Sequence, residues 1–137
     1  MSALAQLKLL ISLAQIDGKV AERERNFITS IGKSNDIGAD QMDTLLEQRH
    51  ALVVPTDLTD DQKFEYLFSL VKLMKIDERM YKEEMLFCSK IAENLGYENQ
   101  VMFELLLHVK AGVMEKDEII NLKEVTQKHL KNQTDIH

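Results

Sequence analysis

The stretch L10-I-S-L-A-Q-I-D17-G-K-V-A-E-R-E24-R-N-F27-I-T-S-I31 recurs 60 positions later as L70-V-K-L-M-K-I-D77-E-R-M-Y-K-E-E84-M-L-F87-C-S-K-I91. Seven residues are identical at this fixed offset: Leu10/Leu70, Leu13/Leu73, Ile16/Ile76, Asp17/Asp77, Glu24/Glu84, Phe27/Phe87 and Ile31/Ile91. Five of these pairs are apolar and recur at helical spacing, whereas two are carboxylates. The sequence therefore predicts an internal duplication of a helical unit.

Composition favours one all-α domain. The chain has 137 residues, of which 45% are hydrophobic, with one proline and five glycines. Such a chain is long enough to bury a core, and few residues in it break helices. Two units of this size would each bury too little alone, so we expect them to share one core.

The periodicity predicts a single-domain bundle of about seven helices, built from two pseudo-symmetric three-helix halves and a closing C-terminal helix. The domain spans 1–137, with internal repeats at about 5–53 and 60–112. The predicted helices cover about 3–17, 22–34, 40–53, 60–77, 82–95, 98–112 and 115–131. Pro55 marks the connector between the halves, and Thr59 with Gln62 predicts a capping box for the fourth helix. The apolar helix near 98–112 is expected to be a core helix or, in part, a partner surface.

Charge and cysteine content narrow the classes of function. The net charge is -6 and no basic cluster is present, which argues against nucleic-acid binding. No apolar run reaches the ~20 residues of a membrane span. The single Cys88 excludes a disulfide within the chain, predicts a buried and inert thiol, and fits a cytoplasmic location.

The duplicated carboxylates have two interpretations. Asp17 and Asp77 end one helix in each half, and Glu24 and Glu84 fall in the first turn of the next. The helices that follow lack good N-cap residues, so these carboxylates can accept the first free N–H groups. Alternatively, Asp17, Glu24, Asp77 and Glu84 form a metal site for Ca²⁺, Mg²⁺ or Mn²⁺, since clustered carboxylates are hard oxygen ligands.

The duplicated motif resembles that of the TerB-like family, which is named after tellurite-resistance protein B and is also similar to the N-terminal domain of a membrane-anchored J-domain co-chaperone. The motif is an apolar helix, then Asp-Gly, then an acidic residue seven positions after the Asp, repeated once. Asp17, Gly18 and Glu24 match the first copy, Asp77 and Glu84 match the second, and the resemblance covers about residues 5 to 112.

The resemblance implies an all-helical bacterial fold of two similar halves, with an acidic face that binds divalent cations weakly. It further implies an interaction module of stress-response assemblies, without catalysis. Its protein partners are unidentified, and membrane association is expected only through such a partner.

An enzyme is the less favoured alternative. A di-metal carboxylate bundle needs two Glu-x-x-His motifs and two further glutamates. Glu47 and His50 form one such motif, whereas Glu104 and His108 have one residue too many between them. The sequence therefore favours a non-enzymatic binding or scaffold module, and an interaction protein that binds no metal remains the alternative.

Overall fold

The computed structural model describes residues 2–16, 18, 20–77 and 82–131, and it is all-helical. The seven helices in this part of the chain are α1 (Ser2–Ala14), α2 (Glu22–Ser34), α3 (Ala39–Glu47), α4 (Asp60–Asp77), α5 (Lys82–Asn94), α6 (Val101–His108) and α7 (Lys116–Gln127). The described residues form no strand, and their one isolated β-bridge joins Tyr97 to Leu130. The predicted all-α fold is confirmed.

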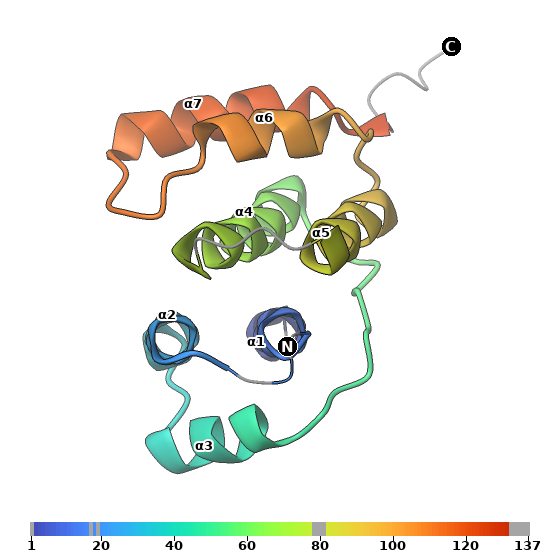
Figure 1. Cartoon of the computed structure of the whole chain (residues 1–137). Helices are drawn as coiled ribbons and strands as arrows, with labels where there is room; N and C mark the ends of the chain where they lie inside the picture. Colours follow the sequence, from blue (N-terminus) through green and yellow to red (C-terminus); the bar gives the residue numbers. More distant parts are fainter. Residues whose placement is uncertain (1, 17, 19, 78–81, 132–137) are drawn as a thin grey trace.

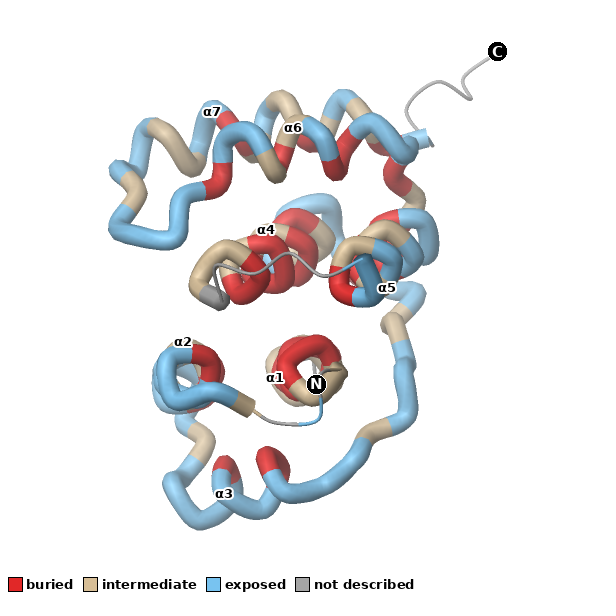
Figure 2. Tube along the Cα trace, in the orientation of Figure 1, coloured by how far each residue is buried: buried red, intermediate tan, exposed pale blue. Residues whose placement is uncertain are grey.

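The helices are stacked in layers around α4 (Figure 1). From one end to the other the layers are α3, then α1 with α2, then α4 with α5, and then α6 with α7. Helix α4 contacts α1, α2, α5, α6 and α7, so it is the central element. The buried positions concentrate on α1 and α4, where those two helices face each other (Figure 2). None of the helices described is long and apolar enough to cross a membrane.

The internal duplication extends from sequence to structure. Shifted by 60 positions, the bounds of α2 coincide with those of α5. Within each half the three helices contact one another, and α1 and α4 join the two halves. A hydrogen bond repeats as well: the Gln15 side-chain amide donates to the Leu46 carbonyl (3.3 Å), and Lys75 Nζ donates to the Leu106 carbonyl (2.6 Å).

Helices α2 and α5 end in the same way. Asp36 and Gly96, which are 60 positions apart, both adopt the left-handed conformation, with φ of 63° and 95°. The next residues, Ile37 and Tyr97, donate their N–H groups back to the third residue from each helix end (3.0 Å in both). This is a Schellman ending. Asp36 is therefore the structural counterpart of Gly96.

Helices α3 and α6 are shorter than the sequence predicted. Helix α3 ends at Glu47 instead of near residue 53, because Gln48 is already extended (φ -97°, ψ 155°). The Leu45 carbonyl accepts the Gln48 N–H group (3.3 Å) and lies 2.8 Å from His50 Nε2. Side chains therefore occupy carbonyls that another helical turn would need. Helix α6 spans only Val101–His108. Its Leu106 carbonyl likewise accepts a hydrogen bond from Lys75 of α4, and Lys72 of α4 binds the carbonyl of Lys110 just beyond the helix.

The predicted capping box at the start of α4 is confirmed. The Thr59 N–H group donates to Gln62 Oε1 (2.9 Å), and the Gln62 N–H group donates to Thr59 Oγ1 (3.1 Å). Both orphan donors are thereby satisfied, which fixes where the connector of residues 48–59 gives way to helix.

Candidate functional site

The four predicted metal ligands are described to different extents. Asp17 lies outside the described residues, and Asp77 is described only by its backbone at the end of α4. The side-chain geometry of the predicted site is therefore known for Glu24 and Glu84.

Glu24 makes the capping contact that its position predicts. It is the third residue of α2, and its Oε1 accepts the N–H group of the N-cap residue Ala21 (3.1 Å). Ala21 has no side-chain acceptor of its own, so Glu24 supplies one half of a capping box. Glu24 is only 3% exposed, which makes it one of the few charged residues in the interior.

Glu84 occupies the equivalent place in α5 and is 2% exposed. Its carboxylate acts on Cys88, one turn further along the same helix. Burial, assisted by the negative charge of Glu84, raises the pKa of the Cys88 thiol to about 12. The predicted inert cysteine follows from this, because a thiol rather than a thiolate is present at neutral pH.

The two glutamates belong to separate parts of the bundle. Viewed along the helices, α1 and α4 lie close together, and α2 and α5 lie on opposite sides of this pair (Figure 1). The two glutamates therefore lie in the first turns of two helices on opposite sides of the α1–α4 pair. Among the described side chains, no three His, Cys, Asp or Glu residues are grouped closely enough to hold a metal ion.

The four residues considered for a di-metal centre lie in two different layers of the bundle. Glu47 and the nearby His50 belong to the α3 end of the stack, whereas Glu104 and His108 lie on α6 at the other end (Figure 1). His108 Nε2 is 3.6 Å from Glu104 Oε2 on an exposed surface. The two Glu/His pairs are therefore separated by the intervening layers of helices.

Helix α6 is peripheral and exposes part of its apolar surface. Phe103 and Leu107, one turn apart, are 70% and 78% exposed, while Val101, Met102 and Leu105 are buried on the opposite side. The sequence favoured a core helix here, but α4 takes the central place and α6 presents an apolar outer face. A groove of about 300 Å³ runs between α6 and α7 next to Leu107, with Leu122 and Val125 in its wall.

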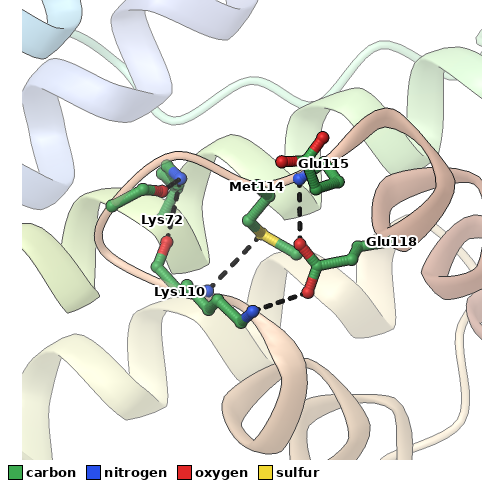
Figure 3. Close-up of polar contacts among 6 residues, drawn as sticks. Lys72, Lys110, Met114, Glu115 and Glu118 are labelled. Carbon is green, nitrogen blue, oxygen red and sulfur yellow. Dashed lines mark hydrogen bonds and ion pairs between the residues drawn. The ribbon is translucent and has the colours of Figure 1, made fainter.

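The loop between α6 and α7 is held in place by charged side chains (Figure 3). Lys72 Nζ donates to the carbonyls of Lys110 (2.8 Å) and Gly112, and Lys110 Nζ lies 2.6 Å from Glu118 Oε2. The Glu115 N–H group donates to the other oxygen of Glu118 (2.9 Å). The Lys110 hydrogen bond, with help from Glu115, lowers the pKa of Glu118. These contacts fix the loop that borders the groove between α6 and α7.

Sequence reasoning missed the lysines that position α6. Lys75 replaces Gln15 at the repeat offset, so a search for identical residues passes over the pair. A comparison of chemical roles at the same offset would have found it, since both side chains donate hydrogen bonds.

No protein-family model matches the chain, and neither the curated proteins nor the solved structures provide a match.

Proposed function

We propose that this chain is a non-enzymatic binding or scaffold module of the TerB-like type, which acts in the cytoplasm and binds protein partners. The observation that carries the proposal is the exposed outer face of α6, formed by Phe103 and Leu107. Neighbouring exposed apolar side chains of this size are typical of protein contacts. The duplicated Asp and Glu motif and the two similar helical halves support the family part of the proposal.

The contact surface is tested by affinity purification from cells of the protein's own source. We expect the wild-type protein to retain partners that the double variant, Phe103→Ser with Leu107→Ser, does not retain. The control is Leu86→Ser, since Leu86 is an apolar residue on α5 that is also exposed (59%). If all three proteins retain the same partners, the outer face of α6 is not the contact surface.

The second candidate role is weak binding of Ca²⁺, Mg²⁺ or Mn²⁺ by Asp17, Glu24, Asp77 and Glu84. The repetition of both carboxylate positions at the offset of 60 favours it, because carboxylates are hard oxygen ligands that suit these ions. Capping is the competing role, and the Ala21 contact supports it directly. If capping is the whole role of the carboxylates, the protein is an interaction module without metal.

Thermal unfolding separates the two roles. A cation at ~100 times its Kd adds about 2.7 kcal/mol to the free energy of unfolding, which raises Tm by several degrees. We expect this rise in wild type and its loss in Asp17→Asn with Asp77→Asn. The variant Glu24→Gln with Glu84→Gln keeps a capping oxygen but removes the charge, so a cation site predicts that it also loses the rise, with a Tm in EDTA close to that of wild type. Flat Tm values with every ion would leave capping as the role of these carboxylates.

A further inference from the structure

Two adjoining cavities follow one face of α1. They have volumes of about 430 Å³ and 330 Å³. Side chains of α1 that are four positions apart line them: Leu4 and Lys8 in the first, and Ser12 and Ile16 in the second. Residues at this spacing share one face of a helix, so the two cavities succeed each other along α1. We call the pair the α1 cleft.

The other side of the α1 cleft is segment 49–53, a non-helical part of the connector after α3. Arg49 and His50 line both cavities, whereas Val53 lines the first and Leu52 lines the second. Arg49 therefore lies where the two cavities meet.

Hydrogen bonds hold the start of this segment. The Gln15 side-chain amide donates to the Gln48 carbonyl (3.0 Å). His50 Nε2 lies 2.8 Å from the Leu45 carbonyl and donates to it, because a carbonyl oxygen only accepts. The segment that borders the α1 cleft is therefore fixed by the protein's own contacts.

Apolar surface is exposed in both cavities of the α1 cleft. Val53 in the first and Leu52 in the second are 63% and 56% exposed. Ile16 and Phe87, which also line the second cavity, are only partly buried. A ligand with apolar side chains at both ends would remove this surface from water.

The charged groups of the α1 cleft are positive. Lys8 and Arg49 line the first cavity together, and neither forms an ion pair with the residues that the structure describes. No Asp or Glu is among the described residues that line either cavity. The groove between α2 and α4 differs, because the charges of Glu65 and Lys72 in its wall balance each other. In a chain with a net charge of -6, the α1 cleft is thus a local site for an anionic group.

We propose that the α1 cleft docks an extended segment of a partner protein in which an acidic residue lies between two apolar residues. The acidic side chain pairs with Arg49 and Lys8, and the apolar side chains occupy the two cavities. The row from Leu4 to Ile16 spans about 18 Å at 1.5 Å per helical residue. About five extended residues match this length at ~3.3 Å each, and alternate side chains of a strand face the same way. The pattern apolar-x-acidic-x-apolar therefore directs all three side chains into the cleft.

A protein segment suits this site better than an anionic membrane does. Basic sites for anionic lipids use clusters of roughly four to eight Lys or Arg residues, whereas Lys8 and Arg49 are the only two that line the described walls of the α1 cleft. A membrane would also face much more of the protein surface, and the net charge of -6 opposes that contact. A short segment meets the cleft alone.

The test is a titration of the ¹⁵N-labelled full-length protein, followed by NMR, with the blocked synthetic peptide Leu-Thr-Glu-Thr-Leu. We expect saturable shifts at the amides of Lys8, Arg49 and Leu52 at up to millimolar peptide. Lys8→Gln with Arg49→Gln should weaken binding about tenfold, which is ~1.4 kcal/mol. The matched control is Lys33→Gln with Lys116→Gln, which removes two exposed cations elsewhere and should bind like wild type.

A second peptide tests the charge contact without changing the protein. Replacing the Glu of the peptide by Gln should weaken its binding to wild type by a similar factor. The same replacement should leave binding to Lys8→Gln with Arg49→Gln unchanged, because that variant has already lost the charge contact.

Four results would overturn the proposal. They are an absence of shifts at millimolar peptide, shifts confined to other surfaces, equal binding of the Glu and Gln peptides by wild type, and equal binding by the two double variants. If the protein does not bind the peptide but co-sediments with phosphatidylglycerol vesicles through Lys8 and Arg49, the cleft is a membrane contact and a partner segment is rejected. Since Phe103 and Leu107 lie on α6, their double Ser variant should bind the peptide like wild type. These outcomes are therefore independent of the purification test of α6.

Discussion

Asp36 and Gly96 occupy the same left-handed position, yet only glycine adopts it without a steric cost. A left-handed L-residue costs roughly 1–2 kcal/mol, and aspartate tolerates the conformation better than most. We expect Asp36→Gly to raise the free energy of unfolding by up to about 1 kcal/mol and Gly96→Ala to lower it by about 1 kcal/mol. Urea unfolding measures both.

Gly112→Ala is the control for these variants. Gly112 has no positive φ, and a Cβ there would meet nothing within 4 Å. Its replacement should change stability little or raise it slightly, by reducing the freedom of the unfolded chain. A loss as large as that of Gly96→Ala would show that glycine content, rather than the left-handed conformation, matters.

The buried thiol of Cys88 predicts that the stability of the protein depends on pH. Its pKa is raised to about 12 by burial, against a usual value near 9. A raised pKa means that the folded state keeps the thiol proton up to a higher pH than the unfolded state does. The contribution is fully present below pH ~9 and is lost as the pH rises towards about 12, with a slope of at most ~1.4 kcal/mol per pH unit.

Between pH 8 and 12, the free energy of unfolding measured in urea should therefore decline more steeply for wild type than for Cys88→Ala. Tyr66, whose pKa burial also raises to about 12, remains in both proteins and leaves a shared residual slope. The native thiol should also resist alkylation at neutral pH. Parallel pH profiles, or rapid alkylation of the folded protein, would contradict this account.

At the scale of elements, the end of α6 depends on a side chain from another helix. Lys75 Nζ donates to the Leu106 carbonyl, as the Gln15 amide does to Leu46 in the other half. Lys75→Gln should therefore retain most of the stability. Lys75→Met should lose about 1 kcal/mol, because a carbonyl near the helix end loses its donor.

Hydrogen exchange of the α6 amides, together with urea unfolding, measures this effect. Faster exchange confined to α6 in Lys75→Met, and near-normal exchange in Lys75→Gln, are the expected results. Equal losses in the two variants would mean that the charge of Lys75, rather than its hydrogen bond, holds α6.

Contacts of this long-range kind explain which helices were predicted well from the sequence and which were not. Helices α2, α4 and α5 were predicted to within one residue, because local signals such as Thr59 with Gln62 and Gly96 mark their ends. Helices α3 and α6 were predicted too long, because their carbonyls bind side chains about 30 residues away in the sequence. Hydrophobic periodicity contains no information about such contacts.

The candidate site likewise combines features that depend on local sequence with features that depend on tertiary packing. The capping contact of Glu24 was predicted because it depends on residues three positions apart. Phe103 and Leu107 are exposed because α4, rather than α6, takes the central position in the bundle. The groove between α2 and α4 depends on how the two halves pair. These features belong to tertiary packing, so a single sequence leaves them open.

At the scale of the whole molecule, the duplication does not produce two independent domains. Helices α1 and α4 bury their apolar sides against each other, with Leu10 and Leu70 both almost fully buried. The Gln6 side-chain amide also donates to Ser69 Oγ (3.0 Å) across this interface. A half of about 60 residues is marginal in isolation even with an intact core, and here each half would expose its main apolar helix.

We therefore expect fragments 1–59 and 60–137 to be largely unfolded when separate and to regain helix when mixed. Circular dichroism of each fragment and of their mixture measures this, and the intact chain should unfold in one transition by every probe. Weakening the contact in the intact chain gives an independent check. Leu10→Ala and Leu70→Ala should each cost about 2–5 kcal/mol, and the cost should appear in the same single transition. Two separable transitions, or a fragment with native-like helix alone, would instead make each half a domain and reduce the α1–α4 contact to an interface between domains.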